Sequence, residues 1–148
     1  MSSNNQVVVD ALKKLLADTY VVYLKTHGFH WNVTGPMFTT LHTLFETHYT
    51  ELAMAVDEIA ERIRSLGAPA PGSYTEFLAL TSVKEASGSP SATAMIEELV
   101  ADQGALVEAA RAVVRAAGDA DDDASGDLGV RRIDVHEKNA WMLRSHLE

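Results

Sequence analysis

FTTLHTLFETHYTELAMAVDEIAERIRSL, residues 38–66, is the stretch of sequence that decides the fold. Apolar residues recur along it every three or four positions, which is the spacing of one face of an α-helix. This apolar stripe consists of Leu41, Leu44, Phe45, Leu52, Val56, Ile59 and Ile63. Gly67 follows as a C-cap, and Pro69 and Pro71 cannot continue a helix. The stretch therefore predicts one long amphipathic helix.

Three more long helices are predicted around it. The first covers about residues 6–33 and the third about 91–117, and an acidic loop over 118–127 precedes a fourth that reaches the C-terminus. The connection before the third helix contains a short helical piece, Tyr74–Thr81, and is longer than a tight antiparallel turn requires. Four long helices with one long connection predict an all-α, ferritin-like four-helix bundle, with the short extra helix between the second and third long helices.

Composition limits the kinds of function that the chain can have. Its 148 residues suit a single domain over residues 1–148. There is no cysteine, which excludes disulfides and thiolate metal sites, so any metal must be held by His, Asp and Glu. The 12 basic and 21 acidic residues give a net charge of -9, which is the wrong sign for wrapping phosphates. With neither a secretory signal nor a membrane span predicted, we expect a cytoplasmic protein without membrane contact.

Four potential metal ligands share one flank of the helix over residues 38–66. At about 100° per residue from His42, Glu46 falls near 40°, Asp57 near 60° and Glu61 near 100°. The apolar stripe occupies roughly 200–320° on the same scale. The four side chains are therefore predicted to face away from the core of their own subunit. Imidazole and carboxylate ligands of this kind suit iron or another divalent cation.

The helical rise limits how these ligands can be used. Glu46 and Asp57 are eleven residues apart, which is about 16 Å at about 1.5 Å per residue. One metal ion cannot contact both, so His42/Glu46 and Asp57/Glu61 are either unrelated half-sites or are completed by a second chain. A two-fold axis near residues 51–52 would place each pair beside the other pair of an antiparallel copy. Spacing alone also fits an ordinary solvated helix face.

Longer segments of the chain carry a more specific signature. They are Lys25–Phe38 with its His30-Trp31-Asn32 core, Leu41-His42, Glu51–Ala53, Asp57–Arg64, Val135–Lys138 and Ala140–Arg144. Together these segments closely resemble the Dps family of miniferritins over essentially the whole chain.

The resemblance implies a hollow dodecameric cage that acts as a ferroxidase. Sites at a dimer interface would oxidise Fe(II), preferentially with hydrogen peroxide and otherwise with dioxygen, and the ferric iron would be stored as mineral, which protects against oxidative damage. Matched position by position, His30, His42 and Glu46 would come from one subunit, with Asp57 and Glu61 from its neighbour.

Three further residues take expected roles from the same resemblance. Trp31 would lie near the iron site, where it would serve either electron transfer or interface packing. Asp122 and Asp127 would line a three-fold pore that attracts cations, or would simply belong to a solvated loop.

The alternative function is that of a DNA-binding nucleoid protein in which iron oxidation is secondary. Many Dps-like proteins condense DNA through basic terminal extensions. Residues 1–12 contain no Lys or Arg, and residues 144–148 contain one Arg. We therefore expect DNA binding to be weak.

Overall fold

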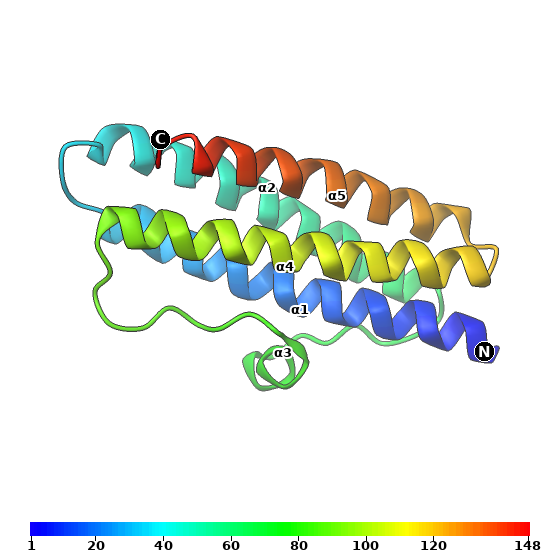
Figure 1. Ribbon diagram of the computed structural model, residues 1–148. Helices are drawn as coiled ribbons and strands as arrows, with labels where there is room; N and C mark the ends of the chain where they lie inside the picture. The colour runs from blue at the N-terminus through cyan, green and yellow to red at the C-terminus, as the bar shows by residue number, and fades with distance from the viewer.

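The computed structural model describes residues 1–148 and contains helices but no strand (Figure 1). The helices are α1 (Ser3–Asn32), α2 (Phe38–Ser65), α3 (Tyr74–Leu80), α4 (Ala92–Asp119) and α5 (Asp123–Arg144). The prediction of an all-α bundle of four long helices, with a short helix in the connection between the second and third, is confirmed. None of these helices is both long enough and apolar enough to span a bilayer.

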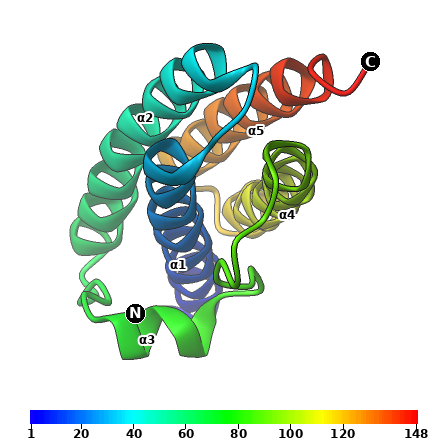
Figure 2. The ribbon, with the colours of Figure 1, turned by 90° about the vertical axis from the view of Figure 1, so that its left-hand side faces the viewer.

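The long helices lie side by side as two antiparallel hairpins (Figure 1). Helix α1 packs against both α2 and α4, and α5 packs mainly against α4. A long crossover carries the chain from the end of α2 back to the start of α4, so these two helices run in the same direction. Helix α3 lies within this crossover, outside the bundle and against α1 (Figure 2).

Local sequence signals account for most helix ends. Ser2 and Ser91 accept hydrogen bonds from the amides of Asn5 and Ala94, as N-cap side chains do. Gly67 has a φ of +91°, and the amide of Ala68 reaches back to the carbonyl of Ile63, so the predicted glycine stop of α2 is confirmed.

The prediction of an acidic loop over residues 118–127 is wrong. Helix α4 continues to Asp119, and α5 already begins at Asp123. Asp122 is the N-cap of α5: its carboxylate accepts hydrogen bonds from the Ser125 amide at 3.0 Å and from the Ser125 hydroxyl at 2.6 Å. The acidic side chains thus belong to a helix N-terminus, where the helix dipole favours negative charge.

The interior of the bundle contains two apolar clusters. The larger cluster includes Leu12, Leu52 and Leu106, and the smaller one includes Phe45 and Leu99 near the α1–α2 turn. Five of the seven stripe residues are buried in α2, namely Leu41, Phe45, Leu52, Ile59 and Ile63, while Leu44 and Val56 are partly buried. The stripe predicted from the sequence therefore forms the face of α2 that packs into the bundle.

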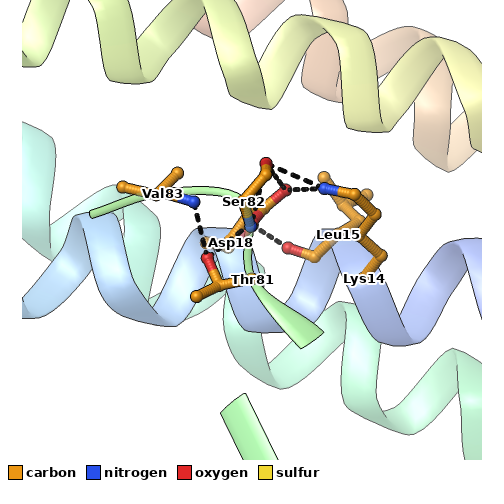
Figure 3. A network of polar contacts seen from close by, with 7 residues as sticks. Lys14, Leu15, Asp18, Thr81, Ser82 and Val83 are labelled. Atoms are coloured by element: carbon orange, nitrogen blue, oxygen red, sulfur yellow. Dashed lines mark hydrogen bonds and ion pairs between the residues drawn. The ribbon is translucent and has the colours of Figure 1, made fainter. Parts of the chain in front are cut away.

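A buried carboxylate fastens the crossover to α1 (Figure 3). Asp18 is fully buried, and its Oδ1 accepts hydrogen bonds from the Thr81 hydroxyl at 2.6 Å and the Ser82 amide at 2.8 Å. Its Oδ2 pairs with the Lys14 ammonium at 2.8 Å. Because these partners satisfy the carboxylate, its charge can be buried while it holds the end of α3 against the bundle.

Replacing this carboxylate should destabilise the fold. Asp18→Ala would leave the Thr81 hydroxyl and the Ser82 amide without their acceptor, so we expect a loss of roughly 3 kcal/mol in the free energy of unfolding. Urea unfolding at one fixed protein concentration measures this loss. Asp10→Ala, at an exposed position of the same helix, is the matched control, and equal losses in the two variants would contradict the anchoring role.

Candidate metal site at the α1–α2 corner

Two histidines face each other where α1 ends and α2 begins. The His30 and His42 rings are stacked with centroids 3.7 Å apart and planes 13° apart. The Nδ1 of His30 lies 2.6 Å from the carbonyl oxygen of His42, and the Nδ1 of His42 lies 2.7 Å from the carbonyl oxygen of His30. The two residues therefore fix one another in a reciprocal arrangement.

This arrangement decides which ring nitrogens can bind a metal. A carbonyl oxygen only accepts hydrogen bonds, so each Nδ1 must carry the proton that is donated. The Nε2 of each neutral ring is then left with its lone pair, which is the form that coordinates a metal ion. A backbone carbonyl that holds the other ring nitrogen is a common way of orienting a metal-binding histidine.

Three carboxylates extend the candidate site along α2. Glu46, Asp57 and Glu61 are all exposed, so their side chains lie outside the core of the subunit. None of them forms an ion pair within the chain, whereas nearby Glu58 pairs with Arg131 and Glu51 pairs with Arg132. The three carboxylates are thus free to act as ligands.

The ligands do not gather into a site within one chain. His30 and His42 come together at the α1–α2 corner, but no three His, Asp or Glu side chains form a group able to hold a metal ion. Asp57 and Glu61 lie further along α2, in a shallow groove between α2 and α5. A metal ion at the histidine pair could take Glu46 from the same chain, but Asp57 and Glu61 could join it only from another chain.

Aromatic side chains border the histidine pair. The ring of His27 lies 4.1 Å from that of Trp31 and 4.1 Å from that of Tyr49, and Tyr49 in turn meets His30 edge-on at 5.2 Å. Trp31 is 60% exposed, so a large part of its indole is available to a partner. Sequence patterns alone did not identify Tyr49, because its contacts depend on how α1 and α2 pack.

The two candidate pore residues lie at the start of α5. Asp122 is occupied as the N-cap and also pairs with Arg62 at 2.9 Å, and these contacts lower its pKa although burial opposes them. Asp127 is exposed and pairs with Arg131 at 2.9 Å. Of the two, Asp127 is the more accessible to a passing cation.

A separate polar layer lies inside the bundle. The Nδ1 of buried His136 donates a hydrogen bond to the Gln103 amide oxygen at 2.7 Å, and its Nε2 lies 3.2 Å from the Arg132 guanidinium. Arg132 also pairs with Glu51, with NH2 at 2.8 Å from the carboxylate. Nearby, neither ring nitrogen of buried His48 has a partner. Glu51 balances the charge of the arginine, so the one carboxylate of this layer is already paired and is not free to bind a metal ion.

Burial keeps both interior histidines neutral. It lowers the pKa of His48 from 6.5 to about 4, although the charge of Glu51 opposes this shift. Burial, followed by the charges of Arg132 and His48, lowers the pKa of His136 well below 6.5. The protonated forms are therefore disfavoured in the folded protein.

The fold should consequently lose stability in weak acid. Between pH 6.5 and about 4 the unfolded chain binds a proton at His48 that the folded chain does not, so stability falls as the pH falls through this window. In His48→Leu we expect the fall between pH 7 and pH 4.5 to be smaller by about 2 kcal/mol. Urea unfolding from pH 7 to pH 4.5 checks it, with His146→Leu at the partly exposed C-terminus as control. Equal pH dependence in His48→Leu and the unmodified protein would contradict this role of His48.

Comparison with known proteins shows that this architecture is shared. A family model of the ferritin-like domain matches residues 9–148. The DNA protection during starvation protein 2 of Bacillus anthracis is 38% identical over 143 residues, covering 97% of this chain and 98% of that protein. The structure of a Dps protein from Bacillus brevis matches with a TM-score of 0.97 at 38% identity, covering 100% of this chain and 99% of that one.

A third relative is described in terms of its metal chemistry. The Dps protein from Vibrio cholerae O1, described as a member of a broad superfamily of ferritin-like diiron-carboxylate proteins, matches with a TM-score of 0.94 at 34% identity, covering 99% and 92% of the two chains. The bundle, its crossover and these matches define the present chain as a ferritin-like protein. Within that class it belongs to the Dps family, and the family assignment made from the sequence is confirmed.

Proposed function

We propose that this protein is an iron-storing miniferritin whose subunits oxidise Fe(II) at sites shared between two chains. The observation that carries the proposal is the reciprocal pair of His30 and His42, which leaves two Nε2 atoms free beside a flank of unpaired carboxylates. We further propose that the chains assemble into a hollow dodecamer that holds ferric mineral, and that it works in the cytoplasm.

The ligand set suits the oxidation of iron. Carboxylates are hard ligands that favour Fe(III) over Fe(II), so Glu46, Asp57 and Glu61 would promote loss of an electron, while the two imidazoles retain Fe(II) beforehand. Two Fe(II) ions supply the two electrons that, with two protons, convert one hydrogen peroxide into two water molecules. This pairing releases no hydroxyl radical. Dioxygen is the alternative oxidant.

A two-fold axis near residues 51–52 is the simplest way to complete the site. In an antiparallel pair of α2 helices, His42 and Glu46 of one chain lie level with Asp57 and Glu61 of the other. The same symmetry operation generates two equivalent sites for each dimer. Ala53 is exposed near the proposed axis, and its small side chain permits close approach of the two helices.

Mixing two inactive variants tests whether the site is shared. His42→Ala and Asp57→Ala should each abolish most rapid Fe(II) oxidation, because every site then lacks one ligand. In a mixed dimer, one site carries both defects and the other carries none. Co-assembled variants should therefore recover activity at about a quarter of the wild-type sites, since half of random dimers are mixed and each has one intact site of two. Stopped-flow absorbance of ferric iron measures the recovery.

Two controls accompany this mixing experiment. Glu108→Ala removes an exposed carboxylate from α4 and should oxidise iron at the wild-type rate. Affinity tags on the two variants verify that the particles contain both chains. If verified mixed particles recovered no activity, the two-fold site would be refuted.

We propose Asp127 and Asp122 as parts of a cation entry path. Asp127 is exposed, and together with Glu58 it shares the single guanidinium of Arg131, so one negative charge remains in excess near the start of α5. Asp122 has a structural role at the same helix end, because it caps α5 and pairs with Arg62. In this proposal Asp127 acts mainly on iron entry and Asp122 acts mainly on the shape of the opening.

DNA binding is the second candidate function, because relatives are named for DNA protection. The net charge of -9 opposes it. We expect the assembled protein to leave duplex DNA unshifted in a gel at neutral pH and about 0.1 M salt, without Mg²⁺. Tight retention of DNA that weakens as salt is added would contradict this expectation and favour the nucleoid function.

A further inference from the structure

All four tyrosines of the chain lie in one continuous series of ring contacts. Tyr49 of α2 meets Tyr23 of α1 at a centroid distance of 6.2 Å. Tyr23 meets Tyr20, one helical turn earlier, at 5.6 Å, and Tyr20 meets Tyr74 of α3 at 6.3 Å. Each of these pairs is edge-to-face, within the distance range of interacting aromatic rings.

One end of this tyrosine series lies at the candidate metal site. Tyr49 contacts His30 at 5.2 Å and stacks with His27 at 4.1 Å. The series is therefore in ring contact with a proposed iron ligand.

The other end lies at the surface of the chain. Tyr74 is 66% exposed, whereas Tyr20, Tyr23 and Tyr49 are all partly buried. Tyr74 is the first residue of α3, which lies against α1 outside the bundle (Figure 2). The series thus leads from the α1–α2 corner, along α1, to an exposed ring on the surface of the subunit, in a groove that it shares with Ala60 of α2.

The tyrosines and the phenylalanines of the chain occupy different places. The four phenylalanines occupy other places: Phe29 and Phe45 belong to the apolar core, Phe38 meets His42, and Phe77 stacks on the side of Tyr20. Every link in the series joins one phenol to another. A phenol differs from a phenyl ring in that it can give up an electron and a proton.

We propose that the four tyrosines form a relay that carries a one-electron oxidising equivalent away from the metal site to Tyr74. The relay rests on the proposed oxidation of Fe(II) by peroxide, and it would act when a site holds a single Fe(II) ion. That ion supplies only one of the two electrons that hydrogen peroxide requires.

The electron count closes if Tyr49 supplies the second electron. Fe(II), hydrogen peroxide, the Tyr49 phenol and one further proton yield Fe(III), two water molecules and the Tyr49 phenoxyl radical. Each later step moves one electron and one proton from the next phenol to the preceding phenoxyl. At Tyr74 a soluble thiol gives up a hydrogen atom, which restores the phenol and leaves a thiyl radical in solution.

The environment of Tyr20 supports such a transfer. Burial, then the neighbouring phenols of Tyr74 and Tyr23, raise the pKa of Tyr20 above its ordinary value. Tyr20 thus stays protonated before it is oxidised, and its proton leaves together with the electron.

A spin-trapping experiment on the assembled protein tests the relay. The protein receives fewer Fe(II) ions than it has candidate sites, then hydrogen peroxide with a nitroso spin trap, and peptide mass spectrometry locates the adduct. In the unmodified protein we expect the adduct on Tyr74. In Tyr23→Phe, which keeps the ring but removes the oxidisable hydroxyl, we expect loss of the Tyr74 adduct and its appearance on Tyr49.

Two further variants sharpen the result. Tyr20→Phe should also remove the Tyr74 adduct but allow adducts on Tyr23 as well as Tyr49, which gives the order of the steps. Trp141→Phe changes an aromatic residue that is 60% exposed and has no contact with the series, so it should leave the adduct on Tyr74.

Several outcomes would overturn the relay. An equal yield of Tyr74 adduct in Tyr23→Phe would mean that solution radicals attack Tyr74 directly, and adducts on Trp31 or Tyr49 alone in the unmodified protein would mean that no charge travels along α1. Ferric absorbance recorded on the same samples separates the two proposals. Rapid iron oxidation without the shift of adducts would refute only the relay, whereas no site-dependent iron oxidation would refute the proposed function and the relay with it.

Discussion

The rise of α2 determines which of the candidate ligands can bind the same metal ion. A helix advances about 1.5 Å per residue, so the eleven residues from Glu46 to Asp57 separate the two ligand pairs by about 16 Å, whatever rotamers the side chains adopt. Glu46, Asp57 and Glu61 project from the exposed flank of this rigid rod and have no ion-pair partner in their own chain. In the proposed dimer, assembly and chemistry are therefore coupled, because a single subunit has good ligands but no complete site.

The same hydrogen bonds serve the fold and the proposed chemistry at the α1–α2 corner. The carbonyl of His30 lies in the last turn of α1, where carbonyls lack partners within the helix, and the Nδ1–H of His42 donates to it. The reciprocal bond from His30 to the carbonyl of His42 fastens the start of α2 to α1. Together these bonds hold two helix ends and leave both Nε2 atoms in the metal-binding form. The hydrogen bonds that join the end of α1 to the start of α2 thus also hold the two proposed histidine ligands in place.

Periodicity was enough to predict the fold, because each long helix carries its own apolar stripe, and helical arithmetic was enough to place Glu46, Asp57 and Glu61 on one flank. Reading the sequence failed at the start of α5. A run of acidic residues there has the composition of a loop, although Asp122 and Ser125 form a helix N-cap. Such a reading also could not reveal the pairing of His30 with His42, or the contacts of Tyr49 and Tyr74 with α1. Those features depend on long-range packing, and no local pattern encodes which faces of two helices meet.

Histidines on one helix have opposite roles because of where they point. His48 is six residues after His42, which is a rotation of about 240° and places it among the apolar stripe rather than on the ligand flank. There it is buried and kept neutral, near Glu51 and His136. Since Arg132 is paired with Glu51 and contacts His136, the polar layer of the bundle already holds a cation of its own. The carboxylate of this layer is therefore already paired, and the outward flank of α2 is left as the place where carboxylates without ion-pair partners could receive the proposed iron.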